Sequence, residues 1–194
     1  MDQETVLNEF REAGALLEGH FLLSSGLHSP VYLQCAKVLM DPVRASRLCA
    51  AFVEKIKATG VQIDLVVSPA MGGVIVGYEV ARQLGVPGIF TERVDGEFAL
   101  RRGFEIPEGA KILMMEDIIT TGLSSRECIT TIGAWGGDVV AAGCLIDRSG
   151  GKSEVGAPVT ALATIDAPTY KADALPPALT AIQAIKPGSR GLKT

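Results

Sequence analysis

The sequence has no excess of basic residues, because 22 Asp and Glu outnumber 18 Lys and Arg and leave a formal net charge of -4. Such a chain has no general positive field that would attract nucleic acid. The sequence also lacks a long apolar run. Its longest uncharged stretch, residues 65–78, is interrupted by Pro69 and three glycines and is shorter than the ~20 residues that a membrane-spanning helix needs. We therefore expect neither nucleic acid nor a membrane as a partner.

Cysteine is scarce, and its spacing gives no motif. The four cysteines, Cys35, Cys49, Cys128 and Cys144, lie far apart and form no CxxC pair. Apolar or helical sequence surrounds each of them, which favours small buried side chains in a reducing compartment over disulfides or zinc. The first four residues are acidic and lack the basic region and apolar core of a signal peptide. We therefore expect a cytoplasmic protein.

The order of apolar runs and turn signals predicts one α/β domain over residues 1–194. Helices are predicted at 2–13, 42–58, 73–84, 123–135 and 177–185, and strands at 20–23, 31–34, 65–67, 89–90, 111–115, 139–146 and 161–165. Strands alternate with helices in the part 61–194, which predicts a central parallel sheet flanked by helices. Residues 1–60 form a small N-terminal appendage, in which the segment 24–30 is too polar and kinked to join the core.

The loop after the strand 111–115 carries the strongest functional signal. Glu116 and Asp117 stand side by side at the strand end, where their charges repel each other and lose solvation unless a ligand uses them. Sugar hydroxyls can donate hydrogen bonds to both carboxylates. The residues leading into the next helix are Ile118, Ile119, Thr120, Thr121, Gly122, Leu123 and Ser124. Hydroxyls and free backbone N–H groups at a helix N-terminus suit a phosphate, so the segment 111–125 predicts a ribose-phosphate site. A helix cap beside two solvated carboxylates is the alternative.

The string Glu-Asp-Ile-Ile-Thr-Thr-Gly at 116–122 resembles the phosphoribosyl diphosphate signature of type I phosphoribosyltransferases. It is not a Walker loop, which ends in Gly-Lys-Ser/Thr, and it is not a G-x-G-x-x-G dinucleotide fingerprint. The resemblance implies the type I phosphoribosyltransferase fold. It also implies that the two carboxylates meet the ribose hydroxyls and that the Thr-Thr-Gly turn holds the 5′-phosphate.

Two further loops fit the same resemblance. The loop 68–73 follows a strand, and its glycines let the backbone approach an anion closely. The resemblance assigns its residues Ala70, Met71 and Gly72 to pyrophosphate, with a tight turn as the alternative. The loop 91–104 carries Arg93, Arg101 and Arg102. Such a charge run is usually a solvated hairpin, but three arginines beside an anion site also suit a lid over pyrophosphate.

The segment 91–104 resembles the flexible catalytic loop of the family. In orotate enzymes that loop reaches into the partner subunit of a dimer. The resemblance therefore implies a homodimer in which loop 91–104 is shared across the subunits. Orotate enzymes often carry lysines and a histidine in this loop, whereas this chain has only arginines. The acid that assists the leaving group is not identified by the sequence.

Arg148 directly follows the buried strand 139–146. An arginine there can bind a carboxylate with two parallel hydrogen bonds, and a surface pair with Asp147 is the alternative. The segment 19–32 resembles the N-terminal hood of the orotate phosphoribosyltransferases, because its Ser-Gly-x-x-Ser-Pro core matches at 25–30. The appendage 1–60 would then be the hood. The resemblance assigns orotate to Thr120, Arg148, Ser25 and Tyr32, with Tyr32 near the pyrimidine ring.

Three positions depart from the family pattern. Ser24 and Leu27 stand where many orotate enzymes have lysine and arginine, and Leu123 replaces a frequent glycine. The implied reaction is transfer of ribose 5-phosphate from phosphoribosyl diphosphate to orotate, giving orotidine 5′-phosphate and diphosphate. The residues assigned to catalysis are Glu116, Asp117, Arg93, Arg101 and Arg102.

The implied cofactor is Mg²⁺, which bridges ribose hydroxyls and diphosphate. This ion keeps several waters and uses few protein ligands, so no protein atom is expected to bind it directly. Asp117 could reach it through a water molecule. Two other functions stay open: a type I transferase that acts on a purine base, and a non-catalytic regulator that senses phosphoribosyl diphosphate. Arg148 and the hood argue against the first, and the net charge argues against a nucleic-acid-binding regulator.

Overall fold

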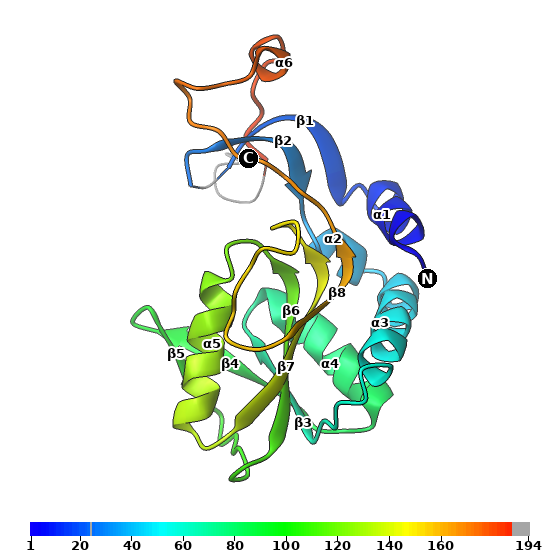
Figure 1. Cartoon of the computed structure of the whole chain (residues 1–194), viewed down its shortest axis with the longest axis vertical. Coiled ribbons are helices and arrows are strands. Elements are labelled where there is room, and N and C mark those ends of the chain that lie inside the picture. The colour runs from blue at the N-terminus through cyan, green and yellow to red at the C-terminus, as the bar shows by residue number, and fades with distance from the viewer. Residues whose placement is uncertain (24, 188–194) are drawn as a thin grey trace.

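The computed structural model describes residues 1–23 and 25–187. Its centre is a six-stranded sheet with the strand order β5-β4-β3-β6-β7-β8 (Figure 1). The strands are β3 (Leu65–Pro69), β4 (Gly88–Val94), β5 (Glu97–Leu100), β6 (Lys111–Ile119), β7 (Asp138–Asp147) and β8 (Val159–Thr164). All neighbours pair in parallel except β4 and β5, which form an antiparallel hairpin. The predicted central parallel sheet is confirmed.

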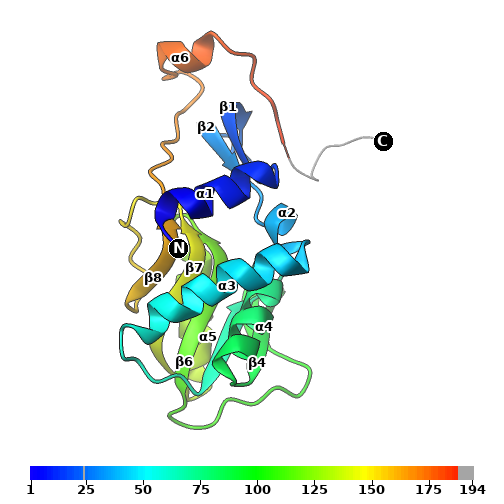
Figure 2. The same ribbon diagram turned by 90° about the vertical axis from the view of Figure 1, so that its right-hand side faces the viewer.

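Helices cover both faces of this sheet. The helices α1 (Gln3–Glu12), α3 (Pro42–Lys57) and α4 (Gly72–Leu84) share one apolar cluster with the strands, whereas α5 (Leu123–Ala134) belongs to a second cluster. Figure 2 shows α3 and α4 side by side in front of the strands. The predicted helix starts at Asp2 and Asp41 are confirmed, because each aspartate accepts a backbone N–H of its helix.

The apolar strand β6 supplies side chains to both clusters. Leu113 and Met115 pack in the cluster of α3 and α4, whereas Ile112 and Met114 pack in the cluster of α5. Successive side chains of a strand point to opposite faces, and both faces of this sheet are covered. That is why the sequence shows a continuous apolar run here and no polar–apolar alternation.

The hood carries an antiparallel hairpin of β1 (Leu16–Leu22) and β2 (His28–Leu33), followed by α2 (Ala36–Leu39). Residues 165–187, which we call the C-terminal strap, leave β8 and run back to this hairpin (Figure 1). His28 and Tyr170 exchange two backbone hydrogen bonds of 2.8 Å. Ile185 accepts the Leu22 N–H and donates to the His20 carbonyl, both at 2.9 Å. Segments from the two ends of the chain are thereby joined.

The structure corrects several predictions of local structure. The helix predicted at 177–185 is α6 (Pro177–Thr180), because the chain then pairs with the backbone of β1. The strand predicted at 111–115 continues to Ile119, since β7 pairs with it over its whole length. The segment 91–104 begins with the β4–β5 hairpin, which is the alternative that its charge pattern offered beside a lid. Ser29, in the segment predicted to be too polar for the core, is fully buried.

The division between hood and core at residue 60 stays a prediction. Helix α3 lies before this boundary, yet its apolar side chains pack in the same cluster as the strands. None of the helices in residues 1–23 and 25–187 is long and apolar enough to cross a membrane.

Gly77 of α4 is required by the close packing of that helix on β3. A Cβ atom at this position would lie 1.9 Å from Ser68 Oγ and 2.9 Å from Ser68 Cβ, and Ser68 is buried in the sheet. We expect Gly77→Ala to lower the free energy of unfolding by about 1–3 kcal/mol, as overpacking of a dense core does. Gly133→Ala in α5 is the matched control, since no atom lies within 4 Å of its Cβ position. It should raise stability by up to ~1 kcal/mol. Equal effects in urea unfolding would contradict this account of α4.

Candidate active site

The candidate site lies at the carboxyl ends of β3 and β6, the two central strands of the sheet. From β3 the chain continues to β4 on one side, and from β6 it continues to β7 on the other side. The loops after the two strands therefore diverge, which leaves the crevice where open α/β sheets bind ligands. In Figure 1 the arrowhead of β6 points toward the hood, so the hood stands at the same end of the sheet.

The loop after β6 forms a cavity of about 350 Å³ with the start of α5. Its lining residues are Glu116, Asp117, Ile118, Thr120, Thr121, Gly122, Leu123, Ser124 and Ser125. The first N–H groups of a helix have no partner within the helix, and Gly122 at the N-cap has no side chain to accept them. The Leu123 N–H has only a long contact with Thr121 Oγ1, at 3.5 Å, so these groups are available to an anion, which the helix dipole also favours.

The backbone of this loop is held from behind by two side chains. Arg126 donates from Nη1 to the carbonyls of Thr121 and Glu154, at 3.0 and 2.7 Å. The Ser153 hydroxyl donates to the Thr120 carbonyl at 2.8 Å. Gly122 has a left-handed φ of 72°, which favours glycine. The loop is thus shaped before any ligand binds, with its carbonyls turned to the protein.

The two adjacent carboxylates differ in their environment. Burial, and secondly the charge of Asp117, raise the pKa of Glu116 to about 8 against the opposing effect of Arg93. Burial also raises the pKa of Asp117, while the N–H of Ile118 opposes this by donating to Oδ1 at 2.8 Å. Near neutral pH Glu116 therefore carries a proton that a cation or a metal-bearing ligand would displace.

The loop after β3 comes close enough to share these carboxylates. A Cβ atom on Gly72 would lie 2.8 Å from Asp117 Oδ1, so only glycine fits there without displacing that carboxylate. A cavity of about 180 Å³ lies between the loops, and its lining includes Ala70, Gly72, Arg93, Glu116 and Asp117. Met71 is 85% exposed, and the peptide bond between Ala70 and Met71 is cis.

Of the three arginines predicted in the lid, the structure brings only Arg93 to the carboxylates. Arg93 stacks 4.1 Å above the Phe98 ring and pairs with Glu127. Arg102 instead donates two hydrogen bonds to Glu92, at 2.9 and 2.7 Å. Neither Arg101 nor Arg102 is among the residues that line the cavity of Arg93. Their positions follow from the antiparallel hairpin, which extends the sheet away from the crevice.

A third cavity, of about 450 Å³, lies between the hood, the loop after β7 and the C-terminal strap. It is lined by Leu23, Ser25, Leu27, Thr120, Thr121, Arg148, Ser149, Asp166, Ala167, Pro168 and Thr169. Tyr32 is not in this lining. Its ring packs on Phe21, with 5.8 Å between the ring centroids. Ser24 lies outside the described residues.

Arg148 is the charged group of this third cavity. Its side chain donates from Nη2 to Ser29 Oγ at 3.0 Å, and its Nε is buried without a hydrogen-bond partner. Burial lowers the pKa of Arg148. A buried guanidinium with an unsatisfied N–H is costly until an acceptor reaches it. The predicted alternative, a surface pair with Asp147, is wrong, because the Asp147 carboxylate accepts from Ser149 and Gly151 instead.

The three cavities form a connected row. The cavity of Arg148 and the cavity at α5 share Thr120 and Thr121. The cavity at α5 and the cavity of Arg93 share Glu116, Asp117 and Ser124. A single elongated ligand, or two ligands that react with each other, can therefore contact Arg148, the start of α5 and Arg93 together.

Two parts of the site were missed by the sequence analysis. Ser29 stands in the quoted Ser-Gly-x-x-Ser-Pro core, but nothing in the sequence paired it with Arg148. The strap residues 166–169 follow β8 directly. Ligands of such sheets bind beyond the carboxyl ends of the strands. The position of residues 166–169 after the last strand is therefore the sequence signal that indicates them.

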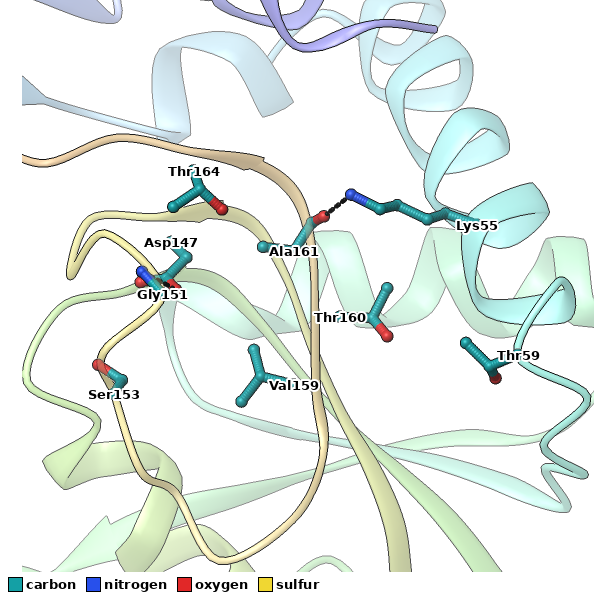
Figure 3. Close-up of a pocket in the computed structure, with 9 residues that line it drawn as sticks. All are labelled: Lys55, Thr59, Asp147, Gly151, Ser153, Val159, Thr160, Ala161 and Thr164. Atoms are coloured by element: carbon teal, nitrogen blue, oxygen red, sulfur yellow. Dashed lines mark hydrogen bonds between the residues drawn. The ribbon is translucent and has the colours of Figure 1, made fainter.

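A separate cavity of about 310 Å³ lies beside β8, on the side of α3 (Figure 3). Its two charged residues already have partners within the protein. Lys55 Nζ donates to the Ala161 carbonyl at 2.6 Å, and the Asp147 carboxylate is bonded as described above. The Lys55 contact caps a carbonyl of the edge strand β8, which is a structural role.

Comparison with known proteins agrees with this geometry. A family model described as "Phosphoribosyl transferase domain" matches residues 43–178. Similar solved structures include an orotate phosphoribosyltransferase from Aeropyrum pernix, with a TM-score of 0.69 and 24% identity over 82% of this chain and 93% of that chain. They also include an adenine phosphoribosyltransferase from Saccharomyces cerevisiae, with a TM-score of 0.63 and 21% identity over 80% and 99%. These likenesses show the fold, and the fold alone does not distinguish the base.

The chain belongs to the phosphoribosyltransferase family and has the type I fold expected from its sequence. A relative from Caulobacter vibrioides, named orotate phosphoribosyltransferase, is 61% identical over 193 residues and 100% of both chains. A relative of the same name from Phenylobacterium zucineum is 60% identical over 193 residues and 100% of both chains. Within the family, the chain is therefore a member of the orotate phosphoribosyltransferases, which are pentosyltransferases.

Enzymes of this family generally use a divalent metal ion with phosphoribosyl diphosphate. Glu116 and Asp117 offer the carboxylate oxygens that hard divalent ions prefer. Within residues 1–23 and 25–187, no group of three His, Cys, Asp or Glu side chains lies together. Glu116 and Asp117 are thus the residues at this site whose chemistry fits such an ion.

The raised pKa of Glu116 predicts how stability depends on pH. Between its ordinary value of 4.5 and about 8, the folded protein keeps a proton that the unfolded chain releases. The free energy of unfolding of the ligand-free protein should therefore fall as pH rises through this window, by up to ~1.4 kcal/mol per pH unit from this group. Glu116→Gln should lose this component and exceed the wild type in stability at pH 8, but not at pH 4.5. Urea unfolding at both pH values measures this, and an unchanged pH dependence would contradict it.

Proposed function

We propose that this protein transfers ribose 5-phosphate from phosphoribosyl diphosphate to orotate, giving orotidine 5′-phosphate and diphosphate. The connected row of three cavities is the observation that carries this proposal. The row begins at a buried arginine, which suits the base, and continues to a helix N-terminus, which suits the ribose phosphate. It ends at an arginine beside a glycine loop, which suits the diphosphate. The reacting groups follow one another in the same order. Membership of the orotate phosphoribosyltransferases supports the choice of base.

Each subsite has a proposed set of contacts. The 5′-phosphate would accept N–H and hydroxyl groups from residues 118–124, apart from the Ile118 N–H, which donates to Asp117. Glu116 and Asp117 would accept hydrogen bonds from the ribose hydroxyls. The diphosphate would lie against Ala70, Met71 and Gly72, with Arg93 compensating its charge. The carboxylate of orotate would accept from Arg148, whose Nε has no partner, with Thr120 and Ser25 beside the ring.

The chemistry needs no covalent nucleophile. The bond from C1 of the ribose to the diphosphate oxygen breaks, and a bond from C1 to N1 of orotate forms, while the proton on N1 passes to water or to the leaving diphosphate. Positive charge develops on the sugar, and the negative charge of the ionised carboxylates would stabilise it. Binding both reactants in one row would lower the activation barrier further, because the reacting atoms are already held in a fixed geometry and do not have to meet by random encounter. We propose Mg²⁺ as the divalent ion, which would neutralise the diphosphate as it leaves.

We also propose that the protein works as a homodimer in the cytosol. The outer face of α4 exposes Met71, Ile75 and Tyr78, with 85%, 51% and 69% of each residue accessible. Their spacing places them on one side of the helix. Met71 belongs also to the diphosphate loop, so a second copy bound on this face would lie beside the site. The hairpin of the partner could then bring Arg101 and Arg102 to the diphosphate.

The four cysteines, all free and buried, are suited to a reducing compartment.

Asp117→Asn tests the assignment of the carboxylates. The change keeps the shape of the side chain but removes the charge that stabilises the reacting sugar. We expect kcat to fall by about 100-fold or more, with no loss of thermal stability, because the change removes a buried charge. The assay is the loss of orotate absorbance after phosphoribosyl diphosphate and Mg²⁺ are added. Asp138→Asn is the control, because Asp138 is exposed and pairs with Lys111 at the opposite end of the sheet.

Near-normal turnover by Asp117→Asn would contradict the assignment of this residue. A wild-type protein that leaves orotate unchanged but consumes a purine base would replace the proposed acceptor. Binding of phosphoribosyl diphosphate without turnover of any base would favour a regulator.

Ile75→Asp tests the dimer. A charge in the middle of a buried apolar contact costs several kcal/mol, so the variant should sediment as a monomer at concentrations where the wild type is a dimer. Its kcat should fall too if the partner supplies lid arginines. Ile182→Asp on the strap is the control, since Ile182 is 48% exposed and lies away from α4. A wild type that is monomeric at micromolar concentration would overturn the proposal.

A further inference from the structure

Ser29 is a fully buried polar residue in β2 of the hood. Its Oγ accepts hydrogen bonds from two donors: the N–H of Val31, at 3.2 Å, and Nη2 of Arg148, at 3.0 Å. Ser29 and Arg148 are 119 positions apart in the sequence. The contact therefore exists only because the hood folds over the loop after β7.

The side chain of Arg148 has few other restraints. Its backbone N–H is fixed by the Ile119 carbonyl at 2.8 Å, but its Nε has no partner. Among the described residues, no carboxylate forms an ion pair with it. The nearby hydroxyl of Ser149 is already engaged, because it donates to Asp147 at 2.6 Å. The bond to Ser29 is thus the contact that sets the direction of the guanidinium.

We propose that Ser29 is a positioning residue that orients Arg148 toward the carboxylate of the base. This inference rests on the proposed function, in which Arg148 binds orotate. A planar guanidinium recognises a carboxylate through a rigid set of N–H groups, so recognition depends on its orientation. With Nη2 held by Ser29, the plane of the guanidinium is fixed, and its remaining N–H groups, including the unpartnered Nε–H, keep a set direction. Ser29 therefore determines the preference for a pyrimidine that carries a carboxylate.

The predicted defect is specific to one substrate. Ser29→Ala removes the acceptor with little change in volume, so Arg148 keeps its charge but loses its orientation. A hydrogen bond to a charged group contributes enough to change affinity by about 10-fold to 100-fold. We expect the KM for orotate to rise by about that factor, while the KM for phosphoribosyl diphosphate stays within about twofold. Loss of a merely structural contact would affect both substrates or the thermal stability alone.

The experiment compares wild type, Ser29→Ala, Arg148→Ala and the double variant in steady-state kinetics with Mg²⁺. Uracil-6-carboxamide, an uncharged analogue of orotate, is added as a competitive inhibitor. Its inhibition constant should be about equal in wild type and Ser29→Ala, because it lacks the carboxylate. The double variant should be no worse than Arg148→Ala, since Ser29 acts through Arg148. Ser46→Ala is the matched control: Ser46 also accepts from an arginine, Arg82, far from the site.

Each result decides between the two proposals. A wild type that does not use orotate would overturn the proposed function. A wild type that uses orotate, together with a Ser29→Ala variant whose orotate KM is unchanged, would overturn only the role of Ser29. Equal rises in both KM values, or additive losses in the double variant, would do the same. If Ser29→Ala does not fold, Ser29→Cys keeps a similar volume with a weaker acceptor, and it should show a smaller loss in the same direction.

Discussion

The site depends on one constraint: β6 is buried on both faces and yet carries two carboxylates at its end. The apolar run 112–115 commits the strand to the centre of the sheet, because successive side chains enter opposite apolar clusters. Glu116 and Asp117 then fall where water is excluded. The resulting rise in the pKa of both groups stores an electrostatic cost that only a cationic or hydrogen-bond-donating ligand can relieve. Burial of the strand and reactivity of the site have the same physical origin.

The remaining parts of the site are arranged around this strand end by the loops of its neighbours. Gly72 allows the loop after β3 to approach Asp117, and Arg126 and Ser153 hold the loop before α5. The base cavity is different, since the hood and the C-terminal strap build two of its walls. The strap is attached to the hood by backbone hydrogen bonds at Tyr170 and Ile185. The wall over Arg148 is therefore made from both ends of the chain.

The sequence predicted those features whose signal is local. The strand–loop–helix around 111–125, the caps at Asp2 and Asp41, and the alternation of strands and helices all depend on residues close together in the chain. Predictions failed where a distant partner decides the outcome. The segment 91–104 could be read as a solvated hairpin or as a lid, and only the pairing of β4 with β5 shows that Arg102 has Glu92 as its partner. The contact of the Tyr32 ring with Phe21, which lies on the neighbouring strand of the hairpin, likewise has no local signal in the sequence.

The sequence by itself determined the class of fold and the ribose-phosphate loop, because periodicity and the signature 116–122 are properties of contiguous residues. It also determined that an arginine follows β7. Only the tertiary structure decided that Arg148 is buried with an unpartnered Nε, that Ser29 holds it, and that residues 166–169 close the same cavity. These features depend on the packing of the hood against the sheet, where residues more than one hundred positions apart exclude water together. Hydrogen bonds formed across such a contact leave no periodic or local trace in the sequence.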